Sequence, residues 1–112
     1  MNLLYSEQYK EDGGVKNNMI NFKDKNIRIN KCLFVEDDDI KNRYLIYVKE
    51  VNGKELKTDK LIGRIIYHKI VNEYVFVPSD EAFIYLTVYR ESTLESITKF
   101  LIEKNKEVPK NG

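Results

Sequence analysis

The dipeptide Asn52-Gly53 is the feature that most restricts what this chain can fold into. Both residue types tolerate the positive φ angles of a type I′ turn, the tightest connection between two antiparallel strands. The preceding segment, Tyr44 to Val51, places apolar side chains alternately on two faces, as a strand does. The pattern therefore predicts a hairpin whose return strand begins either at Lys54 or after the polar stretch that ends at Lys60.

Other short apolar runs surround this hairpin, and each is rich in the β-branched and aromatic residues that favour strands. We expect strands over Ile27–Val35, Leu61–His68 and Glu73–Val77, the last two in the middle of the sheet because both their faces are apolar. Pro78 lacks a backbone N–H and should end the last of them. Phe83–Tyr89 is a candidate fifth strand. The sequence thus predicts a four- to five-stranded antiparallel sheet.

One helix is predicted near the C-terminus. Ser92 and Glu95 have the Ser-x-x-Glu spacing of a capping box, in which Ser92 is the N-cap. A 3.6-residue period then aligns four apolar side chains on one stripe, which we expect to pack on the sheet: Leu94, Ile97, Phe100 and Leu101. The expected fold class is therefore α+β, with an antiparallel sheet packed by one C-terminal helix.

The length of 112 residues fits a single domain. We divide it into an irregular N-terminal arm (1–25), the sheet (26–90), the helix (92–105) and a polar tail (106–112). The first segment is polar with two small apolar clusters, and we interpret it either as an arm that docks by those clusters or as a partly mobile tail.

The overall charge identifies no partner, because nineteen Lys and Arg nearly balance eighteen Asp and Glu. No apolar run is long enough to cross a bilayer, and the N-terminus lacks the layout of a signal peptide. A single cysteine is more typical of reducing compartments than of small secreted domains. We therefore expect a cytoplasmic protein without a membrane partner.

Catalytic and cofactor chemistry find no support in the sequence. His68 is the only histidine and Cys32 the only cysteine, whereas metal and nucleophilic sites need several ligands or an oriented base. We interpret His68 as a strand-end residue and Cys32 as a small buried hydrophobe. No glycine-rich segment joins a strand to a helix as nucleotide sites require. We therefore expect a non-enzymatic protein that holds neither a metal nor a cofactor.

The acidic run Glu36-Asp37-Asp38-Asp39 has three interpretations. Four successive carboxylates suit a solvated turn, which is the simplest of them. A hard-cation site is the second, although the alternating spacing of a calcium loop is absent. The third is that the carboxylates imitate nucleic-acid phosphates and bind a basic groove on another protein.

Aromatic residues concentrate in the predicted sheet, where they either fill a core or a protein interface, or stack nucleic-acid bases on an open face. Base stacking also needs nearby cations, which Arg64, Lys69 and Arg90 could supply. If the acidic run is only a turn, we expect the partner surface on the sheet face around Tyr47, Arg64 and Tyr67.

Residues 44–105 resemble a group of small phage and mobile-element proteins. The resemblance lies in the spacing of four motifs: Gly63-Arg64-Ile65-Ile66-Tyr67, Tyr74-Val75-Phe76-Val77-Pro78, Thr87-Val88-Tyr89, and the helical stripe of Leu94, Ile97, Phe100 and Leu101. It implies a biological setting more than a mechanism. The turn Lys69-Ile70-Val71-Asn72 departs from the pattern because it lacks the Trp and Arg usual there, and residues 1–43 have no counterpart.

The expected function is that of a phage or mobile-element accessory protein that binds and modulates a host or element protein. Inhibition of a bacterial defence system, in the manner of an anti-CRISPR protein, is one form of that action. The alternative is a small nucleic-acid-binding domain that uses the sheet aromatics and the nearby Arg and Lys. A structural virion component is a third possibility.

Overall fold

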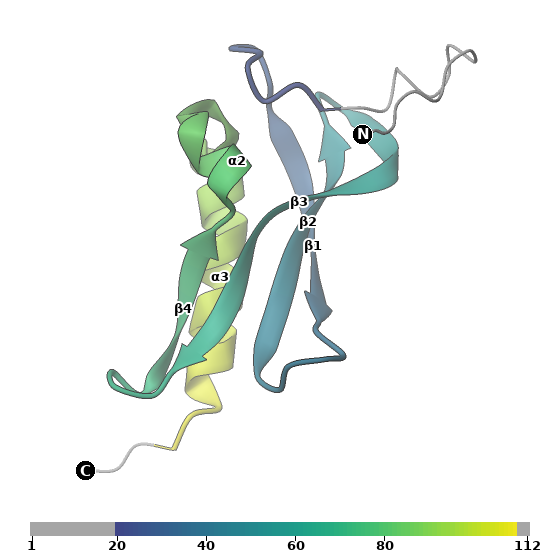
Figure 1. Ribbon diagram of the computed structural model, residues 1–112. Coiled ribbons are helices and arrows are strands. Elements are labelled where there is room, and N and C mark those ends of the chain that lie inside the picture. The colour runs from purple at the N-terminus through teal and green to yellow at the C-terminus, as the bar shows by residue number, and fades with distance from the viewer. Residues whose placement is uncertain (1–19, 110–112) are drawn as a thin grey trace.

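The computed structural model describes residues 20–109, so predictions for the first nineteen residues and for 110–112 lie outside the described residues (Figure 1). Four strands form one antiparallel sheet in chain order: β1 (Ile29–Glu36), β2 (Arg43–Val51), β3 (Lys54–His68) and β4 (Glu73–Pro78). Three further elements follow: α2 (Asp80–Ile84), the 3-10 turn η1 (Leu86–Val88) and the long helix α3 (Glu91–Lys106). The α+β fold with one C-terminal helix is confirmed.

The β2–β3 hairpin turns at the dipeptide that predicted it. Asn52 and Gly53 have φ angles of 51° and 81°, both in the left-handed region that this turn requires. The Asn52 side chain accepts a hydrogen bond from the Arg28 N–H at 2.9 Å, and the Asn30 side chain accepts one from the Gly53 N–H at 2.6 Å. The return strand begins at Lys54, the first of the two alternatives.

The sheet curls because its pairing is irregular at several points. The β2–β3 register shifts between Ile46 and Tyr47 and again between Val48 and Glu50. Gly63 lies where β3 and β4 approach closely: a Cβ atom there would be 2.7 Å from the Phe76 ring and 2.8 Å from the Val77 carbonyl oxygen. A larger residue at position 63 would force the two strands apart, so glycine is required.

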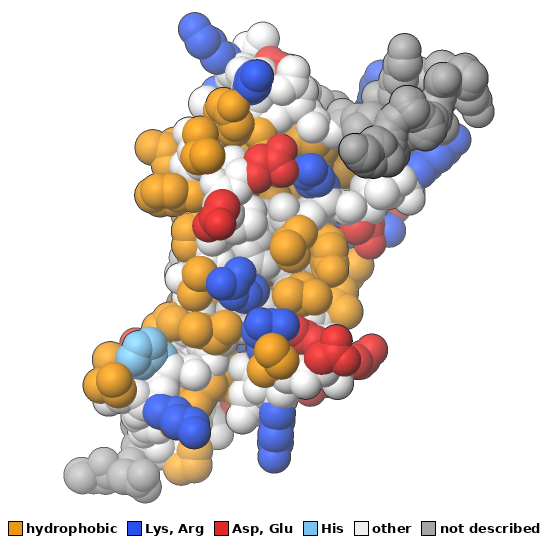
Figure 2. Space-filling view, in the orientation of Figure 1, with side chains coloured by type: hydrophobic (Ala, Val, Ile, Leu, Met, Phe, Trp, Pro, Cys, Tyr) orange, Lys and Arg blue, Asp and Glu red, His pale blue; other side chains and the backbone are white. Residues whose placement is uncertain are grey.

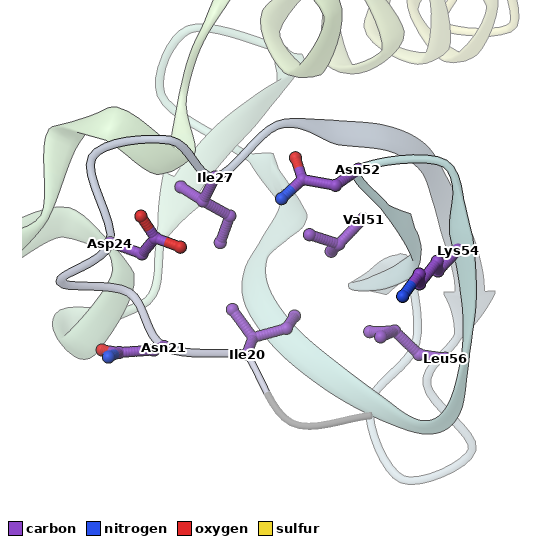
Figure 3. A pocket seen from close by; sticks show the side chains of 8 residues that line it. All are labelled: Ile20, Asn21, Asp24, Ile27, Val51, Asn52, Lys54 and Leu56. Carbon is purple, nitrogen blue, oxygen red and sulfur yellow. The ribbon is translucent and has the colours of Figure 1, made fainter. Parts of the chain in front are cut away.

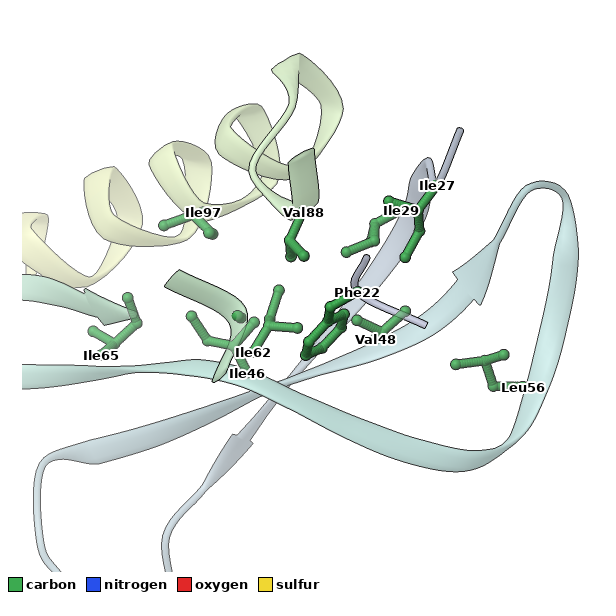
Figure 4. Packing of buried hydrophobic residues seen from close by; sticks show 11 residues of the cluster. Phe22, Ile27, Ile29, Ile46, Val48, Leu56, Ile62, Ile65, Val88 and Ile97 are labelled. Atoms are coloured by element: carbon green, nitrogen blue, oxygen red, sulfur yellow. The ribbon is translucent and has the colours of Figure 1, made fainter. Parts of the chain in front are cut away.

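The hydrophobic core lies between the sheet and α3 (Figure 4). Side chains from every strand except β4 are fully buried in it, together with Phe22 and Ile27 of the segment before β1. The Phe100 ring of α3 stacks on Phe34 of β1, with the ring centroids 4.3 Å apart. Phe22 is 3% exposed, so the described end of the N-terminal segment packs into the core.

The helix boundaries agree with the prediction within one residue, but its cap does not. The N-cap is Arg90, which makes no side-chain capping bond, and Ser92 already lies in the first turn of α3. The Ser92 hydroxyl donates a hydrogen bond to the Ile29 carbonyl oxygen of β1 at 2.7 Å. The capping-box prediction for Ser92 is wrong because a tertiary acceptor takes the hydroxyl.

The buried stripe of α3 is also rotated from the predicted one. Thr93 is 1% exposed and Ile97 is 3% exposed, whereas Leu94 is 46% exposed. Phe100 and Leu101 pack against the core as predicted. Leu94 therefore does not belong to the stripe, and a small polar residue takes its place against the sheet.

Two predictions about the strands are wrong. Residues 83–89 form the end of α2 and η1 instead of a fifth strand, because the Ser79 side chain accepts a hydrogen bond from the Ala82 N–H and starts a helix. β4 is an edge strand and does not lie in the middle of the sheet. Pro78 does end it, as predicted.

The free edge of β4 is covered by one side chain of α3. The Asn105 amide oxygen accepts a hydrogen bond from the Tyr74 N–H at 2.6 Å, and its amide nitrogen donates to the Tyr74 carbonyl oxygen at 3.3 Å. The amide thus makes the two bonds that a neighbouring strand would make. It also fixes the C-terminal end of α3 to the sheet.

We predict that Ile97→Ala lowers the free energy of unfolding by about 2–5 kcal/mol, because the change leaves a cavity in the core. Leu94→Ala on the same helix should cost about 0.5 kcal/mol or less, since that side chain is largely exposed. Urea unfolding of the two variants measures the difference. Equal effects would contradict the observed orientation of α3.

Asn105→Ala should lower the free energy of unfolding by about 1–3 kcal/mol, because both backbone groups of Tyr74 lose their partner. Amide hydrogen exchange should become faster at Tyr74 in particular. Lys106→Ala, at the exposed neighbouring position, is the matched control. Unchanged exchange at Tyr74 in the Asn105 variant would show that the amide does not cover this edge.

Candidate partner-binding surface

One face of the sheet packs α3, and the opposite face, which we name the outer face, is mostly apolar except where His68 pairs with Glu73 at its end. Cross-strand pairing aligns its side chains in three rows. The rows are Leu33–Tyr47–Leu61, then Val35–Leu45–Arg64–Val77, and then Arg43–Ile66–Val75. Antiparallel sheets with one solvated face normally carry polar residues there. The composition of the outer face is therefore unusual for a surface that only meets water.

The apolar side chains of the outer face are neighbours across the strands. Leu33, Val35 and Leu61 are 39%, 38% and 37% exposed, and the neighbours between them are half-buried because adjacent rows shield one another. Figure 2 shows hydrophobic side chains in groups over the sheet and over α2, with Lys, Arg, Asp and Glu side chains between the groups. Neighbouring apolar side chains mark interaction surfaces more often than scattered apolar residues do.

Arg64 lies in the middle row of the outer face, between Leu45 of β2 and Val77 of β4. Among the described residues it forms no ion pair. A half-buried guanidinium surrounded by apolar side chains can offer its donors to a carboxylate of a partner. Tyr47 lies on the same face, one row away, so the structure brings these two predicted residues together.

Tyr67, the third residue predicted for this surface, lies on the opposite face. Its ring meets Tyr74 edge to face, with the centroids 5.5 Å apart, and its hydroxyl hydrogen-bonds the Asn72 side chain. Tyr74 in turn contacts Tyr44 on the side of the sheet that packs α3. Tyr67 therefore cannot share a contact surface with Tyr47 and Arg64.

The acidic run divides into one structural carboxylate and three exposed ones. The Asp37 side chain is 7% exposed and lies 2.5 Å from Arg43 Nη2, while its other oxygen accepts the Asp39 N–H at 2.8 Å. These bonds, the backbone one first, hold the pKa of Asp37 below its ordinary value. Glu36, Asp38 and Asp39 are exposed. The solvated-turn interpretation fits Asp38 and Asp39, whereas Glu36 is the last residue of β1 and Asp37 is held by Arg43.

Cys32 lies half-buried on the face that packs α3, and its burial raises the pKa of the thiol to about 11. It is thus protonated at neutral pH and a poor nucleophile, which agrees with the interpretation of Cys32 as a small hydrophobe. His68 ends β3, as predicted, opposite Glu73. Between residues 20 and 109, no group of three His, Cys, Asp or Glu side chains could hold a metal ion.

The aromatic side chains of the sheet do not form a platform on the outer face. Tyr44, Tyr74 and Phe76 pack against the core on the α3 side, and the Phe76 ring meets Tyr89 edge to face. The three outer rows contain a single aromatic residue, Tyr47. The geometry that successive base stacking needs is therefore not found there.

A hollow of about 240 Å³ lies between the β2–β3 hairpin and the segment before β1 (Figure 3). Its polar lining includes Asn21, Asp24 and Asn52, and each of these side chains accepts a hydrogen bond from a nearby backbone N–H. These groups hold turns in place. We therefore do not assign the hollow a chemical role.

We expect Asp37→Asn to lower the free energy of unfolding at pH 7, whereas Asp38→Asn should not. The folded-state pKa of Asp37 lies below the unfolded value of about 3.9, so its carboxylate stabilises the fold above that pH. This contribution is lost as the pH falls through the folded-state pKa. Urea unfolding between neutral and acidic pH should show the gap between wild type and Asp37→Asn closing at low pH. A gap that does not depend on pH would contradict this role.

Sequence reasoning missed most of the apolar residues of the outer face. The signal was present, because both faces of the strands read as apolar, but it was interpreted as burial in the middle of a sheet. None of the described helices has the length and apolar character needed to cross a bilayer. No family model, curated protein or solved structure matches the chain, so its function has to be argued from this surface.

Proposed function

We propose that the chain is a non-enzymatic accessory protein that binds another protein through the outer face of its sheet. The observation that carries the proposal is the three apolar rows with Arg64 at their centre. Apolar residues with an arginine among them are the composition that protein interfaces favour at their centre. Removal of this surface from water on binding would supply most of the affinity.

The arrangement of charges on the outer face supports an acidic region on the partner. Arg64 forms no ion pair among the described residues, whereas Arg43 is already paired with Asp37. A carboxylate of the partner placed against Arg64 would give a charge-assisted hydrogen bond in a largely apolar surrounding. The exposed Glu36 ends β1, and the exposed Asp38 and Asp39 follow it in the turn; these carboxylates would steer a basic part of the same partner.

The setting of this binding comes from the resemblance of residues 44–105 to small phage and mobile-element proteins. In that setting the partner is a host or element protein in the bacterial cytoplasm. Modulation of a defence system, as by an anti-CRISPR protein, follows if the partner belongs to one. Nucleic-acid binding receives less support, because the outer rows contain a single aromatic residue.

Photo-crosslinking tests the outer face directly. A benzophenone amino acid at Leu61, on the outer face, should yield a crosslinked protein in lysate from a plausible bacterial host. The same group at Leu94, on α3, should not, although Leu94 is at least as exposed. Mass spectrometry identifies the crosslinked protein.

The identified partner then allows the surface to be tested with purified proteins. Leu61→Lys and Arg64→Glu should each weaken binding by more than about tenfold, and Leu94→Lys should leave it unchanged. Crosslinking from Leu94 but not from Leu61, or full binding by the Arg64→Glu variant, would refute this site.

A further inference from the structure

At each edge of the sheet, one side chain of α3 bonds the backbone of a single residue. The Asn105 side chain bonds the edge of β4 at Tyr74, and Ser92 bonds the edge of β1 at the Ile29 carbonyl. Beyond Ile29, no strand among residues 20–109 pairs with the outer side of β1. β1 therefore ends the sheet with a row of unpaired backbone groups, which is a template for another strand.

The pairing with β2 identifies which backbone groups are unpaired. The Asp37 N–H donates to the Arg43 carbonyl oxygen at 2.8 Å, so residues 37 and 43 form a hydrogen-bonded pair. Bonded pairs recur at every second residue of an antiparallel ladder. The backbone N–H and C=O groups of Leu33 and Val35 therefore also bond β2. Cys32, Phe34 and Glu36 consequently direct their N–H and C=O groups away from the sheet.

This part of β1 forms a regular ladder with β2, and α3 packs on its inner face through the stacked Phe34 and Phe100 rings. Its register irregularities lie between Ile29 and Cys32, and the pairing from Cys32 to Glu36 is regular. The outward side chains there are Leu33 and Val35, which are among the exposed apolar residues. A regular, apolar edge of this kind pairs readily with a second strand.

We propose that β1 pairs with β1 of a second copy of this chain, antiparallel and about a two-fold axis at Phe34. In this register the unpaired backbone groups of all three residues find partners. Phe34 bonds Phe34 of the second copy, and Cys32 bonds Glu36 of the second copy. Leu33 of each copy then lies beside Val35 of the other on the outer face, which shields both side chains. Two sheets become one sheet of eight strands.

The charges along β1 favour pairing with β1 of a second copy over pairing with an unrelated strand. The stretch that begins β1 is basic, with Arg28 and Lys31 exposed, and the stretch that ends it is acidic, with Glu36 and Asp38 exposed. Antiparallel pairing brings the basic end of each copy to the acidic end of the other. The same edge is thus complementary to itself, as a two-fold interface requires.

The association is expected to be weak, because one pair of short strands buries less surface than a standard interface. Sedimentation equilibrium from low micromolar to near-millimolar protein should show the mass rising from monomer towards dimer. Added salt should weaken the association, since exposed charges contribute to it. A monomer over the whole range would overturn the proposal.

A matched pair of variants locates the contact. Leu33→Lys should weaken dimerisation by more than about tenfold, because it places an unpaired charge between the two edges. Leu61→Lys, in the same row of the outer face and equally exposed, should leave dimerisation intact. Equal effects of the two would overturn the edge contact. Loss of partner binding in Leu61→Lys with dimerisation retained separates this proposal from the one for the outer face.

Charge exchange gives a test that does not depend on a loss of stability. Arg28→Glu/Lys31→Glu alone and Glu36→Lys/Asp38→Lys alone should both be monomeric, because each places like charges together at both ends of the pair. A mixture of the two should dimerise, since the exchanged charges at each end are then of opposite sign. A mixture that stays monomeric would overturn the proposed register.

Amide hydrogen exchange reports on the backbone of the edge itself. In concentrated protein the Phe34 and Glu36 amides should exchange more slowly than in dilute protein. The Leu33 and Val35 amides, which already bond β2, should show no such dependence. A dimer whose Phe34 amide exchanges at the same rate in both conditions would use another surface and would overturn the proposal.

Discussion

The packing of a single helix on a four-stranded sheet is the constraint on which the rest of the structure depends. α3 places Thr93, Ile97 and Phe100 against one face, and the Phe34 and Phe100 rings stack in that layer. One helix cannot cover the second face as well, yet the strands are apolar on both sides. An uncovered apolar face is thus a direct consequence of how this chain builds its core, and it is the strongest evidence for a binding role.

The sequence predicted those elements whose causes are local. Asn52-Gly53 fixes its turn through the φ angles of two residues, and Pro78 ends β4 through a missing N–H. The extent of α3 follows from its apolar period, within one residue at each end. The predictions of an N-cap at Ser92 and of a strand at residues 83–89 are wrong for a common reason, which is that contacts outside the local pattern decide both. A carbonyl 63 residues away takes the Ser92 hydroxyl, and a helix cap at Ser79 overrides strand propensity.

The site was less predictable because it depends on register. Tyr47 and Tyr67 lie on different strands, and whether they share a face depends on the irregular pairing of β2 with β3. A one-residue slip reverses the face of every side chain beyond it. The alternation of a single strand gives no information on such shifts. Likewise, only the tertiary structure separates Asp37, held by Arg43, from the exposed carboxylates beside it.

The outer face and the edge of β1 are physically connected, because Leu33 and Val35 belong to both. In a two-fold pair about Phe34, side chains that face outward in one copy stay on the same side in the other. The rows of the two outer faces then run on from one copy to the next, and two Arg64 side chains lie on one surface. A partner with two contact regions would bind such a surface more tightly than a monomer, since its second contact forms within the complex. Self-association at the edge would therefore make partner binding depend on the concentration of this protein.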